Sequence, residues 1–309
     1  MFSPSSLKHE KMSIGTIMLD LRELTFLVSL ARHKNFSRAA DDCGISQPAF
    51  SIRIRRMEER VGLPLVRRNK VYVGLTREGE VVLKWARKLL ADEEGLRQEL
   101  DSLNNNLDGK LVLGVVPTAM PFAAKVSSVL RAQHSKLLIE IHSLSTDQIE
   151  LRVNDFSLDA GITYLNDAEP KITTKLYDER YVLIAPEGFV SEPVSEVSWS
   201  CAAELPMCLL TPDMRNRQLL DAVFTKINTV PNVVMEASGF TAVFAQVASG
   251  NAATIAPVDL AKTFLALSST QQFSLTNPEV IHSIGFSVKD QSPVLPMIQA
   301  LQKAINAAL

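Results

Sequence analysis

The chain of 309 residues lacks several features that would place it in a specialised class of protein. It contains no repeats, and no apolar run approaches the roughly 18–20 residues of a membrane-spanning helix. Its beginning, MFSPSSLKHEKMSIGTIMLD, lacks the apolar segment and the cleavage site of a secretion signal. The three cysteines, Cys43, Cys201 and Cys208, form no CxxC pair and leave an odd number, which is typical of reduced thiols. We therefore expect a cytoplasmic protein with packing thiols, and a redox-sensing pair of Cys201 and Cys208 as the alternative.

The chain also lacks the short motifs of common enzymes and metal sites. No HExxH, nucleophile elbow, Walker loop or GxGxxG occurs. The histidines of the second part of the chain, His134, His142 and His282, are scattered. The sequence therefore predicts no catalytic residues, no cofactor and no metal site.

What the chain does contain is an uneven distribution of charge. Residues 1–91 hold 17 Lys and Arg against 9 Asp and Glu, a formal charge of +8. Residues 92–309 hold 15 against 25, a formal charge of −10, so the whole chain carries −2. A basic head on an acidic body indicates that only the head meets a polyanion. A solvated cluster of surface charge explains the totals equally well, so the sequence pattern of residues 1–91 must distinguish between the two explanations.

The basic head contains three predicted helices with a tight turn between the second and the third. Apolar residues at helical spacing over 24–31 mark the first helix. Ser37 is the predicted N-cap of a short helix over 38–43, which ends at Gly44 because glycine adopts the left-handed conformation easily. Ser46 caps the third helix. A short helix, a glycine turn and a second helix form the plan of a helix-turn-helix.

The third helix separates an apolar stripe from a polar and basic surface. The stripe recurs at helical spacing and consists of Phe50, Ile54, Met57 and Val61. In a helix-turn-helix this helix lies in the major groove, where outward residues contact bases and flanking ones contact phosphates. The predicted base contacts are Gln47, Ser51 and Arg55, and the predicted phosphate contacts are Arg53, Arg56 and Arg60. An amphipathic core helix would explain the stripe, but not the capped turn or the basic flank.

Two further patterns follow the third helix. The stretch LPLVRRNKVYVGLTREG alternates apolar and basic residues and predicts a two-stranded wing, in which Arg67, Arg68 and Lys70 contact DNA. Thr76 caps a long helix with leucines at positions 96, 100, 103 and 107. This spacing favours a dimer through a partner helix, and packing against the chain's own second domain is the alternative.

The run LRELTFLVSLARHKNFSRAADDCGISQPAFSIRIRRMEERVGLPLVRRNKVYVGLTREG resembles the DNA-binding domain of LysR-type transcriptional regulators. Its most telling pieces are FSRAA, SQPAFS and LTREG, and the resemblance extends over about 19–309. It implies a winged helix-turn-helix over 18–76, a linker helix for dimerisation over 77–108 and an effector-binding domain over 109–309. Residues 1–17 precede the usual start and are expected to be either a mis-assigned start or an N-terminal arm.

The resemblance and the helix pattern together give the predicted DNA-binding residues. Relatives usually carry a polar or basic residue where this chain has Ile52, so we expect Ile52 to contact a thymine methyl group. The full set is Ser37, Arg38, Ser46, Gln47, Pro48, Ser51, Ile52, Arg53, Arg55, Arg56, Arg68 and Lys70.

From Lys110 onward, short β-type runs alternate with helical stretches, which predicts α/β units around largely parallel sheets. The runs are 111–116, 137–142, 158–163, 181–185, 207–211, 232–236, 252–256 and 282–288. The resemblance implies two lobes like those of periplasmic binding proteins, with the chain crossing between them twice. Lobe one would hold 110–184 and 284–309, and lobe two 185–283. The fold class is therefore α+β and multi-domain.

Several of these runs end at a small or hydroxyl residue that opens a helix. Helix N-termini offer free amides, so two facing groups would hold a small anion or carbonyl compound, with ordinary capping as the alternative. Arg215 and Arg217 are candidates to pair with a carboxylate. By resemblance the effector-binding residues are Pro117, Thr118, Ala119, Ser145, Thr146, Thr163, Tyr164, Thr211, Ser238, Phe240 and Pro257.

The sequence therefore predicts a LysR-type regulator that is not an enzyme. Its expected partners are double-stranded promoter DNA, a small-molecule effector (a small anion or carboxylate) and further copies of itself in a dimer of dimers. No membrane partner is expected. The alternatives are a DNA-binding head fused to a catalytic α/β domain, and an architectural protein that binds DNA without specificity.

Overall fold

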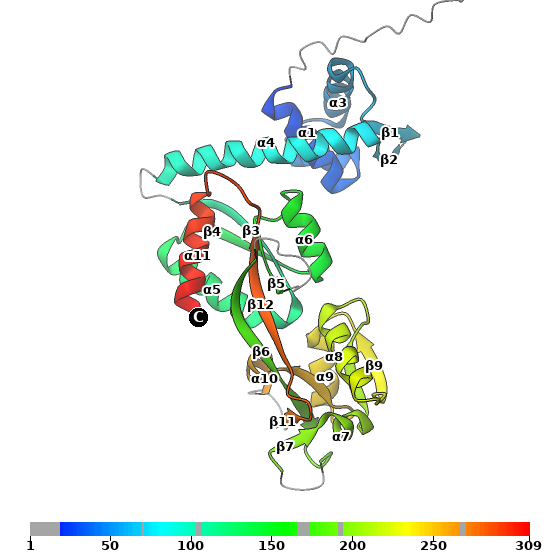
Figure 1. Ribbon diagram of the computed structural model, residues 1–309. Helices are drawn as coiled ribbons and strands as arrows, with labels where there is room; N and C mark the ends of the chain where they lie inside the picture. The colour runs from blue at the N-terminus through cyan, green and yellow to red at the C-terminus, as the bar shows by residue number, and fades with distance from the viewer. Residues whose placement is uncertain (1–18, 70, 103–106, 166–172, 191–193, 266–269) are drawn as a thin grey trace, which may run out of the picture. The chain divides into compact units, whose positions relative to one another are not determined.

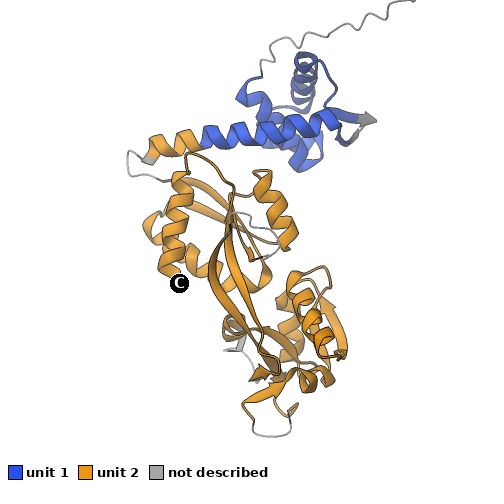
Figure 2. Cartoon of the chain, viewed as in Figure 1, with its two compact units in different colours: residues 1–94 blue, residues 95–309 orange. Residues whose placement is uncertain are grey.

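The computed structural model of the chain describes residues 19–69, 71–102, 107–165, 173–190, 194–265 and 270–309. These residues form two compact units, within residues 1–94 and 95–309, which are coloured separately in Figure 2. The predicted N-terminal extension, Lys70 and Leu103 lie outside the described residues. Within the described part, no helix is long and apolar enough to cross a membrane.

The first unit is a three-helix domain with a β-hairpin, as predicted. Its elements are α1 (Leu21–His33), α2 (Phe36–Asp42), α3 (Gln47–Val61), β1 (Val66–Asn69), β2 (Val71–Leu75) and the beginning of α4 (Arg77–Ser102). The predicted stripe of α3 lies in the core, where Phe50, Ile54 and Met57 are fully buried. Phe50 makes edge-to-face contacts with Phe26 and Phe36 at centroid distances of 5.6 and 6.1 Å. These aromatic contacts join all three helices.

The turn between α2 and α3 follows the predicted plan except at the start of α2. Gly44 has a φ of +66°, and Ser46 Oγ accepts from the Ala49 amide at 3.4 Å, as its predicted capping role requires. The prediction that Ser37 caps α2 is wrong. Asn35 is the cap, because its Oδ1 accepts from the amides of Ser37 and Arg38 at 2.9 and 3.1 Å. Asparagine caps as well as serine does, and the earlier cap brings Phe36 into the helix.

The long helix α4 starts where predicted. The Gly79 amide donates to Thr76 Oγ1 at 2.9 Å, so Thr76 is its cap. The prediction that Leu107 extends the apolar stripe of this helix is wrong, because Leu107 lies beyond α4 and is buried in the core of the second unit. An exposed apolar stripe nevertheless runs along α4 and consists of Val81, Trp85, Leu89, Leu96 and Leu100.

The second unit has two lobes that share two long strands (Figure 1). Lobe one holds β3 (Gly109–Val115), the short helix η1 (Pro117–Ala119), α5 (Met120–Gln133), β4 (Leu137–Ser143), α6 (Thr146–Asn154), β5 (Ala160–Tyr164) and α11 (Pro296–Ala308). Lobe two holds β7 (Glu196–Ser198), α7 (Trp199–Glu204), β8 (Met207–Leu210), α8 (Arg215–Lys226), β9 (Val233–Ala237), α9 (Phe240–Ala248), β10 (Thr254–Pro257), α10 (Val258–Leu265) and β11 (Thr270–Thr276). The shared strands are β6 (Thr173–Pro186) and β12 (Ile281–Val288).

Each lobe has its own core, and the change from one core to the other occurs within β6. Residues of β6 up to Arg180 pair with β12, whereas those from Tyr181 pair with β10 and β11. Tyr177 packs against the core of lobe one and Tyr181 belongs to the core of lobe two. The change therefore occurs around Glu179, before the predicted lobe boundary between residues 184 and 185.

The prediction of largely parallel sheets is wrong for the strands that join the lobes. β3 pairs in parallel with β4 and β5, and β8 pairs in parallel with β9. In contrast, β12 is antiparallel to β5 and β6, and β6 is antiparallel to β10 and β11. A chain that leaves lobe one along one strand and returns along the next must place those two strands antiparallel. Strand composition alone does not reveal this direction.

Candidate DNA interface and effector cleft

The outward surface of α3 carries most of the predicted DNA-binding residues. Ser51 is half-buried, and Ile52 keeps 48% of its surface exposed although it is apolar. The exposed residues of this surface are Gln47, Pro48, Ile52, Arg53, Arg55 and Arg56, with Ser46 at the cap. Ser37 and Arg38 are exposed on α2. The burial of α3 on one side only gives it the form of a recognition helix.

The arginines of the first unit divide into two groups by their partners. Arg60 donates to Glu23 Oε2 at 2.8 Å, and Glu23 is buried in α1, so Arg60 joins α3 to α1. Arg67 folds back on the wing, where its Nε donates to the Leu75 carbonyl at 2.7 Å. Arg68 lies in β1 opposite Tyr72. All four arginines of α3 are exposed, and Arg60 differs from Arg53, Arg55 and Arg56 in its ion pair with buried Glu23.

Four predicted effector residues form two buried hydrogen-bonded pairs in lobe one. Thr118 Oγ1 and the Tyr164 hydroxyl lie 2.9 Å apart. Thr163 Oγ1 donates to Thr146 Oγ1 at 3.0 Å. Ser145 caps α6, since its Oγ accepts from the Gln148 amide at 3.4 Å. The structure therefore brings Thr118 and Tyr164 together, and the hydroxyl of Thr146 faces β5.

The other predicted effector residues are divided between the two lobes. Thr211 and Ser238 follow β8 and β9 in lobe two, and Ser238 is exposed. Phe240 is buried in the core of lobe two and packs on Phe244 at a centroid distance of 5.6 Å. Pro257 is buried at the end of β10. Pro117 and Ala119 flank Thr118 in η1.

The junction between the lobes contains two residues that the sequence did not single out, Glu179 and Asn216. The Tyr164 hydroxyl donates to Glu179 Oε2 at 3.0 Å, and Asn216 Nδ2, on α8, lies 3.4 Å from the Tyr164 oxygen. Burial raises the pKa of Glu179 to about 8, so this carboxyl is mostly protonated at neutral pH. Polar groups of both lobes and of the shared strand thus meet at the Tyr164 hydroxyl.

The sequence does carry a signal for Glu179. Tyr177, Glu179 and Tyr181 lie at alternate positions of β6 and so point to the same face of the strand. A carboxyl between two aromatic rings on one strand face is uncommon in a core, where a charged group needs a partner. Asn216 has no such signal, because it is one polar residue among several in RNRQ.

At this junction lobe two contributes positive charge from Arg215 and from the N-termini of α8 and α9. The N-caps of α8 and α9 are Met214 and Gly239, whose side chains offer no oxygen to the first-turn amides. Arg215 opens α8 and is half-buried; together with burial, which is the larger cause, its charge lowers the pKa of His282 on β12. The helix N-termini and Arg215 therefore favour a negative ligand here.

Arg217 has a structural role, in contrast to Arg215. It is buried and donates to Asp221, Glu236 and the Leu210 carbonyl at 2.8, 2.7 and 2.8 Å. These bonds join α8 to both strands of the small sheet of lobe two. Of the two predicted carboxylate partners, Arg215 is the more accessible, since it is half-buried whereas Arg217 is buried.

Cys201 and Cys208 differ in their surroundings. Cys201 is exposed on α7, whereas Cys208 is buried in β8. Burial raises the pKa of the Cys208 thiol, which disfavours the reactive thiolate.

Comparisons with known proteins agree with this architecture. Residues 21–80 match the bacterial regulatory helix-turn-helix protein family of the lysR type, and residues 104–309 match the LysR substrate binding domain. The hydrogen peroxide-inducible genes activator of Escherichia coli O6:H1 is 25% identical over 293 residues, which cover 94% of this chain and 96% of that protein.

Two solved structures share the fold. One is a variant of full-length OxyR from Pseudomonas aeruginosa, with a TM-score of 0.73, 23% identity and coverage of 94% of this chain and 95% of the other. The second is full-length CbnR in complex with its target DNA, with a TM-score of 0.66, 15% identity and coverage of 94% and 100%. With a recognition helix in the first unit and a two-lobed effector-binding domain in the second, the chain belongs to the LysR family of DNA-binding transcriptional regulators and is not an enzyme.

Proposed function

We propose that this regulator binds an inverted-repeat promoter site in the cytoplasm as a dimer of dimers, through the outward surface of α3 and the wing. Gln47, Ser51 and Arg55 contact bases, and Arg53 and Arg56 contact phosphates. The exposed stripe of α4 supports dimerisation, because five large apolar side chains on one helix face are costly in water. The acidic second unit keeps the rest of the chain from binding DNA indiscriminately.

The proposed effector is a small anion, in particular a carboxylate, bound between the two lobes of the second unit. The observation that carries this proposal is the position of Arg215. It stands at an uncapped helix N-terminus and beside His282 of the shared strand β12. An anion placed there gains the charge of the guanidinium group and the free amides of α8.

Effector binding changes promoter binding through the junction. A ligand beside Arg215 alters the contact between Asn216 and Tyr164, which joins the lobes. Such a ligand shifts the equilibrium between two arrangements of the lobes toward the one that binds it more tightly. The free-energy shift cannot exceed the difference between the binding free energies of the ligand for the two arrangements.

Thiol oxidation is a weaker candidate for the input signal, although a relative is named for hydrogen peroxide. Cys201 is exposed, but a redox pair also needs Cys208, which is buried and whose pKa is raised by burial, and this disfavours its reactive thiolate. For this chain the anion cleft therefore has the stronger support.

The test is thermal unfolding of the full chain with a panel of small organic acids, amino acids and inorganic anions. A ligand at about 100 times its dissociation constant stabilises the binding domain by ~2.7 kcal/mol, a shift of several degrees. The same ligand should alter the affinity for promoter DNA, and R215A should abolish both effects while keeping the unfolding temperature of the free protein.

Three results would contradict the proposal. A ligand that acts equally on wild type and R215A would bind elsewhere. Equal affinity for promoter and random DNA would favour the architectural alternative, and turnover of a ligand by the second unit would favour the catalytic one.

A further inference from the structure

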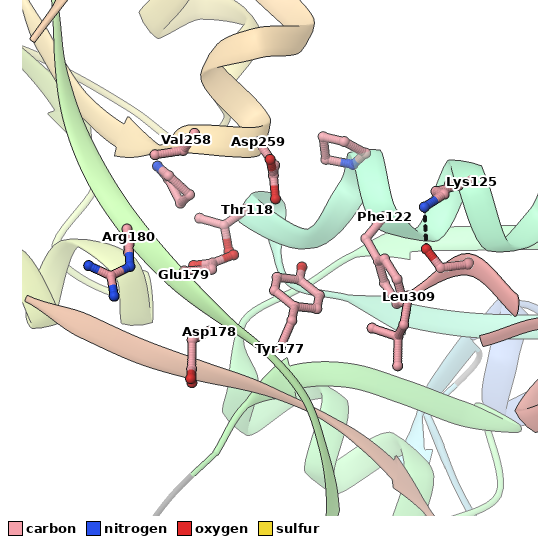
Figure 3. Close-up of a pocket in the computed structure, with 13 residues that line it drawn as sticks. Thr118, Phe122, Lys125, Tyr177, Asp178, Glu179, Arg180, Val258, Asp259 and Leu309 are labelled. Carbon is pink, nitrogen blue, oxygen red and sulfur yellow. Dashed lines mark hydrogen bonds between the residues drawn. The ribbon is translucent and has the colours of Figure 1, made fainter. Parts of the chain in front are cut away.

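A cavity of about 510 Å³ lies in the second unit where β6 meets the beginnings of α5 and α10 and the end of α11 (Figure 3). This volume lies within the range of roughly 300–1,000 Å³ that is usual for small-molecule sites. Two predicted effector residues, Thr118 and Pro257, line this cavity, but none of its described lining residues belongs to α8 or α9, so it does not include Arg215 of the proposed anion cleft.

Aromatic and acidic groups dominate the interior of this cavity. The rings of Phe122 and Tyr177 lie side by side, with centroids 5.0 Å apart. Tyr177, Glu179 and Asp259 all line the cavity, and Figure 3 shows the Tyr177 hydroxyl and the Asp259 carboxyl directed toward its interior. Glu179 is only 4% exposed, whereas Asp259 stands at the exposed first turn of α10.

Three other charged side chains line the cavity, and each has a hydrogen-bond or ion-pair partner. Lys125 donates to the Ala308 carbonyl at one end, and Arg180 pairs with Glu279. Asp178 accepts from Lys175 and Ser283. Asp259 also pairs with Lys262 at 3.0 Å, but both side chains are mostly exposed and water screens that pair.

The immediate surroundings of Glu179 supply hydroxyl groups and a further negative charge. Burial is the main reason why its pKa rises to about 8; hydrogen bonds from Tyr164 and Thr118 oppose the rise, and the charge of Asp259 adds to it. The charge of Glu179 in turn raises the pKa values of Tyr164, Tyr177 and Tyr181, after burial as the larger cause. A buried carboxylate becomes stable when a cation is placed beside it.

We propose that this cavity binds a small organic cation, a protonated amine with an aromatic or apolar body. The body packs on Phe122 and Tyr177, and the ammonium group lies between Glu179 and Asp259. The aromatic faces attract the cation as well as the body. An anion of the same shape would meet two carboxyl groups, and a neutral molecule would gain no charge pair.

The site is coupled to the rest of the domain by Tyr164. Glu179 gives up its proton when the ammonium group binds, and the resulting carboxylate strengthens the bond from the Tyr164 hydroxyl. Because Asn216 of lobe two contacts the same hydroxyl, the amine acts on the contact between the lobes. This inference goes beyond the proposed anion cleft and stands without it.

The test is isothermal titration calorimetry on the full chain with three probes of one shape: phenethylammonium, phenethyl alcohol and phenylacetate. We expect the amine to bind at least about tenfold more tightly than the alcohol, and phenylacetate to bind most weakly. Proton release should appear as a binding heat that depends on the ionisation enthalpy of the buffer. The affinity for the amine should rise by up to about tenfold per pH unit toward about pH 8.

Two variants and one control assign the effect to the two carboxyl groups. E179Q preserves the acceptor for Tyr164 and mimics the neutral acid, so it should fold, bind the amine about tenfold more weakly and release no proton. D259N, at an exposed position, should weaken binding but keep the proton release. E187Q, which removes an exposed carboxylate just beyond β6, should behave as wild type.

The proposal is overturned by any of three results: no measurable heat with all three probes, equal affinity for alcohol and amine, or an E179Q variant that binds the amine as wild type does. Failure of this site and failure of the anion cleft are distinguishable. R215A should leave amine binding unchanged, whereas E179Q should leave the carboxylate response of the cleft in place.

Discussion

The polar groups on the outward surface of α3 differ from those at the junction between the lobes in both burial and sequence separation. On α3 the functional groups are exposed, and they lie close together in the sequence. At the junction Thr118, Tyr164, Glu179 and Asn216 are buried, and nearly a hundred residues separate the first from the last. In the proposed function, DNA recognition depends on side chains that a single helix presents, whereas effector sensing depends on groups that the folded domain brings together.

The largest effect is expected from comparing a substitution on the buried face of α3 with one on its outward face. I54A removes a fully buried side chain and should lower the free energy of unfolding of the first unit by about 2–5 kcal/mol. I52A removes a half-exposed one and should leave stability nearly unchanged while altering DNA affinity. Chemical denaturation and promoter binding measured on both variants check this contrast. Equal stability losses would mean that α3 has no outward face.

The second expected effect concerns the buried carboxyl of the junction. Its raised pKa means that the native state binds a proton that the unfolded state loses above about pH 4.5, so Glu179 costs stability as the pH rises toward about 8. The free energy of unfolding of E179Q relative to wild type should therefore increase over this range, by an amount on the order of a few kcal/mol. Urea denaturation across pH checks it, and a difference that is constant with pH would mean that Glu179 is ionised in the native state.

The contrast between the two regions also explains what the sequence could predict. The stripe of α3 was predictable because Phe50, Ile54 and Met57 follow a local helical period. The network at Tyr164 was predicted only in part. The family resemblance gave Thr118 and Tyr164, whereas Glu179 and Asn216 come from β6 and α8, and no local pattern relates them to the other two. The first half of β6 escaped notice for a similar reason, since TTKLYDER is a polar stretch that becomes a strand by pairing with the distant β12.

A smaller effect separates the arginines of α3. R55A should weaken binding to promoter DNA by about 1–3 kcal/mol and binding to random DNA much less, if Arg55 contacts a guanine. R60A should instead lower stability, because it leaves the buried carboxylate of Glu23 without its partner. Binding isotherms on both kinds of DNA at several salt concentrations check the first expectation. An equal loss on both would make Arg55 a phosphate contact.

The smallest effect concerns the cap of α2, where sequence and structure disagree. Asn35 accepts hydrogen bonds from two first-turn amides, so N35A should lower the free energy of unfolding by about 0.5–2 kcal/mol. Ser37 lies within the helix with an exposed side chain, so S37A should be close to neutral for stability, because alanine is the better helix former. A loss of DNA affinity in S37A without a loss of stability would then assign its hydroxyl to the DNA contact alone. If S37A proved the more destabilising of the two, the cap would be Ser37 after all, and α2 would begin two residues closer to Gly44.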